Sequence, residues 1–164
     1  MFSPQGGLRI SARDLSTIGR LLLGEGVVDG VRLLRPASFR TLTNPEWVFD
    51  GHNGLRGEED TNADASSGIF CRYGLALQTL ATPRPDCADD PRGDGRALIG
   101  HAGSAYGLLS GLWVDRAAGT GVAYFVTGAA QTVGPRSQFT AVEERLLAGE
   151  PLEVLLATTE AHTP

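Results

Sequence analysis

The second half of the chain is a series of short apolar runs separated by clusters of turn-forming residues. Runs of this length that are rich in β-branched and aromatic residues are typical of β-strands, and the Gly, Pro and Asp clusters between them are typical of antiparallel connections. We expect strands at 70–80, 97–101, 108–114 and 121–127. With residues 115–121 as the hairpin between the last two strands, the pattern predicts an antiparallel meander.

Helical signals lie on both sides of this region. Ser11 and Asp14 have the spacing of a capping box, with aspartate in place of glutamate, and the apolar residues that follow lie on one helical face, which predicts a helix over 12–23. Further helices are expected at 36–42, which begins at Pro36, and at 137–148. An Asp-Gly pair predicts a tight turn within 27–33. The predicted fold class is α+β, an antiparallel meander sheet with flanking helices.

The remaining segments are polar or lack periodicity. Residues 45–68 are rich in Gly, Asp, Glu and Asn, so we expect a long surface loop there, anchored by Trp47 and Phe49. Residues 60–64 resemble the start of a calcium loop, but Ala65 stands where glycine is needed and no glutamate closes the frame. We therefore expect no metal site. Residues 151–164 are interpreted as a tail beyond one domain spanning 1–150.

Charge and hydropathy exclude some classes of partner. The 164 residues suffice for one domain with its own core, and the formal net charge is −5. The 14 basic residues are all arginines and are scattered along the chain. Nucleic acid and anionic membranes are bound by clustered basic side chains, so neither is expected as the main partner. No apolar run approaches the ~18 residues of a membrane helix, so no membrane insertion is expected.

Cys71 and Cys87 are the only cysteines. Their separation allows a disulfide that would close a loop of moderate length, which would favour an extracytoplasmic location. Two unbonded cysteines, one half-buried and one facing solvent, fit the same spacing, because spacing does not determine geometry. Both interpretations stay open at this point.

The triplet His101-Ala102-Gly103 has the residue types of a strand that borders a catalytic site. His101-Ala102-Gly103 follows the apolar run 97–100, so a short strand delivers a basic side chain and then a glycine. Some serine hydrolases line an acyl-transfer site in this way. A lone histidine is more often structural, so the triplet alone is a weak signal.

Several segments resemble the serine β-lactamase-like hydrolases, a family that includes penicillin-binding proteins, D-alanyl-D-alanine carboxypeptidases and related esterases. The similar segments, in family order, are PQGGLRISARDL at 4–15, DGVRLLRP at 29–36, GHAG at 100–103, GLWVD at 111–115 and GTGV at 119–122. The resemblance covers about residues 6–127. It implies an incomplete β-lactamase/transpeptidase-like fold that lacks the N-terminal part.

The resemblance also implies roles for individual residues. His101-Ala102-Gly103 takes the place of the family's Lys-Thr-Gly or His-x-Gly triplet, so His101 would supply hydrogen bonding or positive charge beside the substrate. Gly103 would let the backbone approach the ligand, and the Ser104 N–H would be one oxyanion-hole donor. Ala102 and Tyr106 would contact the substrate. The resemblance implies neither a metal nor an organic cofactor.

The nucleophile of that family is missing from this chain. A Ser-x-x-Lys motif needs a lysine, and the chain has none. Ser104 and Ser110 therefore lack a lysine partner, and a Ser104–His101 pair three residues apart on one segment rarely has hydrogen-bonding geometry. We expect the C-terminal portion of a serine hydrolase acting on a β-lactam, a D-Ala-D-Ala peptide or an ester, inactive by itself. The alternative is a non-catalytic binding or assembly module derived from that fold.

The resemblance further predicts partners and a location. In folds of this family the sheet continues past the strand at 121–127, so the outer edge of that strand would be open here. We expect it to pair with the N-terminal portion of the same protein or with a second copy. The expected location is periplasmic or extracellular, and histidine in the triplet favours peptidase or esterase over β-lactamase activity.

Overall fold

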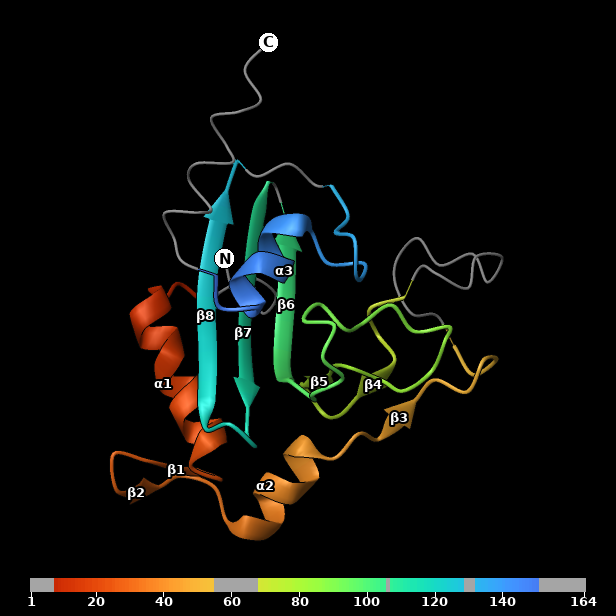
Figure 1. The fold of residues 1–164 in the computed structure, drawn as a ribbon. Helices are drawn as coiled ribbons and strands as arrows, with labels where there is room; N and C mark the ends of the chain where they lie inside the picture. Colours follow the sequence, from red (N-terminus) through yellow and green to blue (C-terminus); the bar gives the residue numbers. More distant parts are fainter. Residues whose placement is uncertain (1–7, 55–67, 106, 129–131, 151–164) are drawn as a thin grey trace, which may run out of the picture.

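Three helices and a six-stranded antiparallel sheet form an α+β fold in the computed structural model, which describes residues 8–54, 68–105, 107–128 and 132–150 (Figure 1). The strands lie in the sheet in their chain order. They are β3 (Trp47–Val48), β4 (Arg72–Tyr73), β5 (Gln78–Thr79), β6 (Ile99–Ala105), β7 (Leu108–Asp115) and β8 (Thr120–Thr127). The predicted antiparallel meander is confirmed, and β6, β7 and β8 are its long strands.

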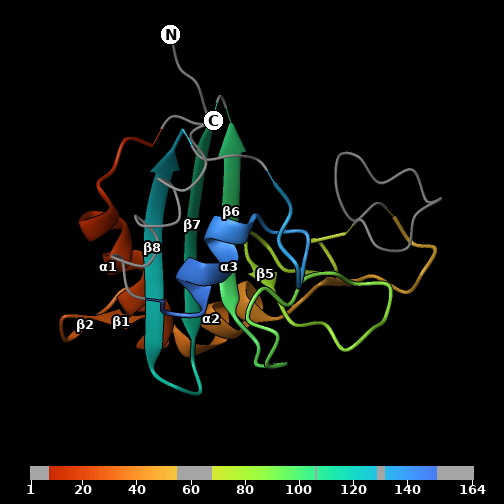
Figure 2. The ribbon, with the colours of Figure 1, turned by 45° about the horizontal axis from the view of Figure 1, so that its top comes forward.

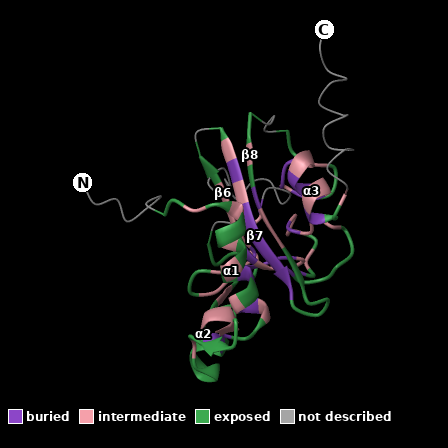
Figure 3. Ribbon diagram, turned by 90° about the vertical axis from the view of Figure 1, so that its left-hand side faces the viewer, coloured by how far each residue is buried: buried purple, intermediate pink, exposed green. Residues whose placement is uncertain are grey.

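Helices cover both faces of the long strands. Helix α1 (Ala12–Leu23) lies against one face and α3 (Ala141–Leu147) against the other, with the sheet between them (Figure 3). The shorter helix α2 (Pro36–Thr43) lies on the α1 side, beyond one end of the strands (Figure 1). Within the described parts of the chain, no helix is both long enough and apolar enough to cross a membrane.

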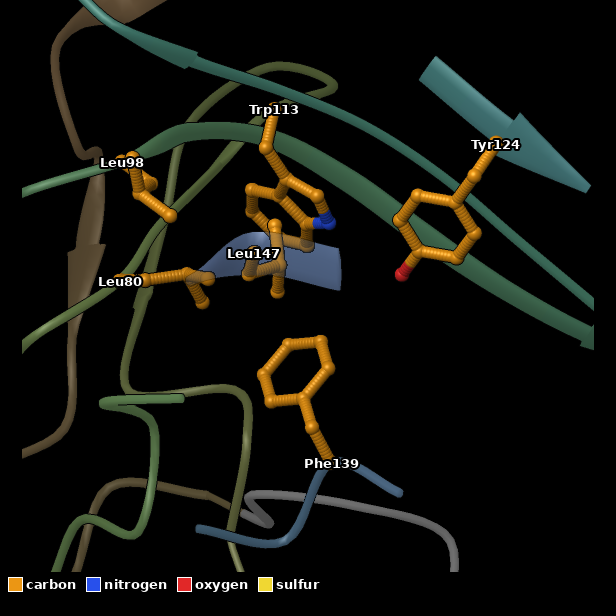
Figure 4. Packing of buried hydrophobic residues seen from close by; sticks show 6 residues of the cluster. All are labelled: Leu80, Leu98, Trp113, Tyr124, Phe139 and Leu147. Carbon is orange, nitrogen blue, oxygen red and sulfur yellow. The ribbon is translucent and has the colours of Figure 1, made fainter. Parts of the chain in front are cut away.

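The core on the α3 face is built around Trp113 of β7. This side chain is fully buried, and its ring meets the ring of Phe139 edge to face, with centroids 5.7 Å apart (Figure 4). The Tyr124 ring of β8 lies against Gly111 of β7, where a Cβ atom would be 2.5 Å from the tyrosine ring. Only glycine at 111 leaves that space. The cluster comprises Leu80, Leu98, Trp113, Tyr124, Phe139 and Leu147.

A second core lies on the opposite face. Val114, next to Trp113 in β7, points the other way because successive side chains alternate along a strand. It packs in a buried cluster with Leu22 of α1 and Phe39 of α2. β7 is therefore the strand that both cores share.

The two helices and the hairpin predicted between residues 12 and 42 are confirmed. Helix α1 has the expected bounds, and the side chain of Ser11 accepts a hydrogen bond from the backbone N–H of Asp14. β1 (Val27–Val28) and β2 (Val31–Arg32) form the small hairpin. Asp29 and Gly30 have φ of 50° and 78°, the left-handed conformations that a tight hairpin turn requires.

The polar segment and the first predicted strand differ from expectation. Residues 45–68 are not entirely loop, because Trp47–Val48 forms β3 and pairs with β4. The single strand expected at 70–80 is instead the two short strands β4 and β5, since the chain turns back at Gly74, whose N–H bonds to the carbonyl of Leu77. A Cβ atom on Gly74 would lie 2.8 Å from the carbonyl oxygen of Asn44, so the turn packs closely on the end of α2.

Two other boundaries are corrected. The strand expected at 97–101 runs over Ile99–Ala105, because its backbone pairs with β7 along its whole length. The helix expected at 137–148 begins at Ala141, because Thr140 is its N-cap. Ser137 stays outside the helix, where its hydroxyl donates to a carboxylate oxygen of Glu144 at 2.8 Å. The predicted tail at 151–164 lies outside the described residues.

The hairpin between β7 and β8, predicted at 115–121, is held by a buried carboxylate. Asp115 accepts hydrogen bonds from the N–H of Ala118 at 2.8 Å and from Arg92 at 3.0 Å, and it also contacts Arg96. Burial alone would raise the pKa of Asp115, but these hydrogen bonds and the two guanidinium groups hold it below the usual range. The carboxylate is therefore more stable in the folded chain than in the unfolded chain.

Replacing this carboxylate should make stability less dependent on acid pH. We expect Asp115→Asn to lower the free energy of unfolding by about 2 kcal/mol at pH 7, the scale of hydrogen bonds to a charged group. Since the folded-state pKa is depressed, the deficit is fully present above the unfolded-state pKa of about 4 and disappears as pH falls through the folded-state pKa. Urea titrations between pH 7 and pH 2.5 measure this. A deficit that does not change with pH would contradict the assignment.

Candidate functional site

The triplet His101-Ala102-Gly103 lies inside β6, paired along β7. His101 is opposite Leu112 and Gly103 is opposite Ser110. Because side chains alternate, His101 and position 103 face the α1 side, whereas Ala102 packs against the Trp113 cluster. The strand therefore presents histidine and glycine together on one face.

The other edge of β6 is paired with β5 only at its start. The register joins Ile99 to Thr79 and Gly100 to Gln78, and the next edge-facing amide, that of Ala102, donates to the side chain of Gln78 at 3.3 Å. Backbone groups alternate in direction along a strand, so the Ser104 N–H points to this same edge. The Ser104 side chain lies on the face opposite His101, so β6 does not bring the two side chains together.

A groove runs along β6 beneath α1. It has a volume of about 370 Å³ and is lined by Leu15 and Ile18 of α1, by Leu77, and by residues 100–103 and 110–112 of the sheet. A Cβ atom at position 103 would lie 2.6 Å from the hydroxyl oxygen of Ser110, so glycine leaves the floor of this groove open. The backbone of β6 is accessible there as a result.

His101 is held by hydrogen bonds from both ring nitrogens. Its Nδ1 contacts the carbonyl oxygen of Ala102, which can only accept, so Nδ1 carries the proton. Its Nε2 lies 2.7 Å from the hydroxyl oxygen of Tyr73 in β4. In the neutral ring Nε2 therefore accepts from the Tyr73 hydroxyl, and in the imidazolium form it donates to the same oxygen. Tyr73 thus orients the imidazole in either state.

Aromatic side chains surround a second hollow on the other side of His101. This aromatic hollow has a volume of about 530 Å³ and is lined by Trp47, Gly54, Phe70, Tyr73 and His101. The Tyr73 ring meets both the His101 ring and the Phe70 ring edge to face, at centroid distances of 5.8 Å and 6.3 Å. His101 therefore lines both the groove and the aromatic hollow.

A disulfide fixes β4, which carries Tyr73. Cys71 and Cys87 are bonded, with Cα atoms 6.1 Å apart, so the alternative left open by the sequence is resolved. Between them, Arg72 donates to the Thr82 hydroxyl at 3.1 Å, and Thr82 in turn donates to the buried Asp89 at 2.6 Å. Burial raises the pKa of Asp89, while the Thr82 hydrogen bonds and Arg72 act in the opposite direction. The bond is compatible with an oxidising compartment.

The sequence alone indicates His101, Ala102, Gly103 and Ser104 as site residues, but it indicates only a strand, and no role in the site, for Phe70 and Tyr73. Trp47 was expected only as a loop anchor, and no spacing rule indicates that it pairs with Tyr73 across 26 positions, as the β3–β4 register shows. Tyr106, predicted to contact the substrate, lies outside the described residues. Among the residues that are described, no cluster of His, Cys, Asp or Glu could hold a metal ion.

Comparisons of the chain with known protein families, curated proteins and solved structures find no match. A function therefore has to be inferred from the chemistry of the chain's own residues.

The histidine–tyrosine contact predicts an NMR signature. We expect the neutral His101 ring to be the Nδ1–H tautomer, with the Nε2 resonance shifted by the hydrogen bond from Tyr73. Tyr73→Phe should move the Nε2 resonance toward the value of a free imidazole nitrogen, at a stability cost of about 1 kcal/mol or less, since the bond is exposed. Two-bond ¹H–¹⁵N spectra of both proteins measure this. An Nε2–H tautomer in the parent protein would contradict the assignment.

Removing the disulfide should loosen the β4 side of the site. Cys71→Ala with Cys87→Ala frees a loop whose ends are 16 positions apart, so we expect a loss of about 3 kcal/mol in unfolding free energy. Chemical denaturation followed by far-UV circular dichroism measures it, and the parent protein in reductant is the matched control. Equal midpoints for the oxidised parent and the double variant would show that the bond does not support the fold.

Proposed function

We propose that this chain is the C-terminal portion of a serine hydrolase of the β-lactamase-like type, and that β6 lines its acyl-transfer site. The observation that carries the proposal is that β6 presents the His101 side chain and Gly103 on the accessible groove, while it directs the Ser104 N–H to the edge that no described strand pairs beyond Gly100. An amide donor stabilises the oxyanion of acyl transfer, and a histidine and an accessible backbone can position the substrate beside the nucleophile.

Each group has a distinct task in this proposal. The backbone N–H of Ser104 donates to the oxyanion that forms when a serine hydroxyl attacks the substrate carbonyl, and the amide of the nucleophile supplies the second donor. His101 gives a hydrogen bond or a positive charge to the bound substrate. Gly103 leaves room for the substrate above the strand. Substrates of the expected classes, a β-lactam, a D-Ala-D-Ala peptide or an ester, all present a carbonyl for such attack.

The nucleophile comes from outside this chain in the proposal. With no lysine among its 14 basic residues, the chain cannot form the Ser-x-x-Lys pair that activates the serine. The chain alone should therefore not turn over substrate. This lack also supports the second candidate, a non-catalytic binding or assembly module that keeps the sheet and its hollows.

The missing part should associate through β8. Among the described residues β8 is the last strand of the sheet, and Phe125 on it is 41% exposed. Unpaired backbone groups on such an edge favour pairing with another strand. We propose that the N-terminal portion of the same protein, or a second copy, adds to the sheet there. The disulfide supports a periplasmic or extracellular location for the assembly.

Native mass spectrometry after exposure to a fluorophosphonate or a penicillin probe tests both proposals. We expect to detect the 17.3 kDa chain without the probe, in a complex with a second polypeptide that carries the probe. In that complex, His101→Gln should slow acylation roughly tenfold to a hundredfold, the scale for losing a hydrogen bond that involves a charged group. Leu75→Ala, an exposed change away from the groove, is the matched control.

Other outcomes separate the candidates. An unlabelled chain found only as a monomer or dimer, together with no acylation in any longer form of the protein, would reject the hydrolase and favour the binding module. Normal acylation of the His101→Gln complex would reject the role of the triplet while leaving the hydrolase in place.

A further inference from the structure

The aromatic hollow is built by a cross-strand pair. Trp47 of β3 and Tyr73 of β4 are directly opposite each other in the antiparallel register, so their side chains lie on the same face of the sheet. Gly54 passes close to the Trp47 ring, where a Cβ atom would be 3.5 Å away, and its φ of +145° favours glycine. The wall is thus held by strand pairing on one side and by the Cys71–Cys87 disulfide next to β4 on the other.

The polar atoms of this wall are already used within the protein. The indole N–H of Trp47 donates to the carbonyl of Asn53 at 3.0 Å. The Tyr73 hydroxyl is bonded to His101 Nε2 at 2.7 Å, and His101 Nδ1 contacts the carbonyl of Ala102. The ring faces and the lone pairs of the Tyr73 oxygen, whose proton is donated to the neutral His101 ring, remain for a ligand. Such a wall recognises mainly by apolar area and ring stacking.

Among the described residues, the lining of the hollow also carries no carboxylate and no guanidinium. Its members are two hydrocarbon-faced aromatic residues, a tyrosine, a glycine and His101. An anionic group placed against this wall would lose hydration without gaining an opposite charge, which is costly. A neutral ligand is therefore favoured over an anionic one.

From these observations we infer that the aromatic hollow binds the neutral, apolar side group of the substrate, an aryl or branched alkyl group of an ester or amide. The identification of this ligand as a substrate rests on the proposed function, whereas the binding itself does not. His101 lines both the hollow and the groove beside Gly103, so a side group in the hollow lies next to the proposed acyl-transfer strand. The inference selects an apolar ester or amide among the candidate substrates.

Tryptophan fluorescence of the chain itself tests the binding. Of the two tryptophans, Trp47 lines the hollow and Trp113 is fully buried in the core, so a ligand in the hollow changes the emission of Trp47. We expect N-methylphenylacetamide, a neutral aryl amide, to give a saturable change with a dissociation constant on the order of millimolar, as for a fragment of its size. Phenylacetate, which keeps the ring but carries a charge, should bind at least about tenfold more weakly.

Variants of the lining residues show whether the ligand binds in the aromatic hollow. Trp47→Phe should abolish the fluorescence change, and Phe70→Ala should weaken amide binding by about tenfold while the circular dichroism spectrum stays unchanged. Leu75→Ala, which removes an exposed apolar side chain outside the hollow, should bind like the parent. If Phe70→Ala does not fold, chemical-shift changes in the Phe70 and Tyr73 rings of the parent protein give the same location.

Equal affinity for the amide and the carboxylate, or no saturable change with either, would overturn the inference. This failure is distinct from failure of the proposed function, because acylation of the partner polypeptide by a serine probe does not depend on what the hollow binds. Conversely, the chain could bind the amide but never be found in an acylated complex. That result would support the binding site in the hollow and would favour the non-catalytic binding module over the hydrolase.

Discussion

Burial of β7 on both faces is the constraint on which the rest of this structure depends. Trp113 and Val114 are neighbours in the strand, both with no exposed surface, yet they belong to different cores. A strand can bury adjacent side chains only if each face of the sheet is covered, so α3 is needed on one side and α1 with α2 on the other. The burial of β7 therefore requires helices on both faces of the sheet. The turned view in Figure 2 shows α3 lying over β6 and β7.

The uneven pairing of β6 follows from this arrangement and creates the site. β6 pairs with the buried β7 over seven residues but with β5 over only two, because β5 is short and the chain then turns away. The part of β6 that contains His101 and Gly103 is therefore firmly positioned on one edge and accessible on the other. Rigid support combined with an accessible edge is what a binding site requires.

Much of the fold could be predicted from local sequence signals. The Ser11 cap, the Asp29-Gly30 turn and the apolar runs after residue 97 act over a few residues, and the corresponding elements are found, although β6 begins at Ile99 and extends to Ala105. The split of 70–80 was missed because Gly74 turns the chain through contact with α2, which lies far away in sequence. The predicted start of α3 was wrong because residues before Thr140 do not extend the helix. They donate hydrogen bonds to a carboxylate of the helix instead, as the Ser137 hydroxyl does to Glu144.

The candidate site could be predicted only in part, for a similar reason. His101 and Gly103 stand in one short segment, where residue type gives a weak signal and the family resemblance singles them out. Their neighbours Trp47, Phe70 and Tyr73 come together through the β3–β4 register and the disulfide. Neither the pairing of two-residue strands nor the bonding of two cysteines can be read from spacing, so the aromatic hollow becomes visible only in three dimensions.

The chain order of the strands has a consequence for how the protein is made. Each strand of the sheet pairs with the next one along the chain, so the hairpins can close one after another as they leave the ribosome, with little loop-closure entropy. Helix α1 is the exception, because its apolar face packs on β7 and β8. After its own synthesis α1 thus has to wait for roughly a hundred further residues, several seconds at ordinary translation rates, before its docking surface exists. During that interval α1 is a natural client for a chaperone.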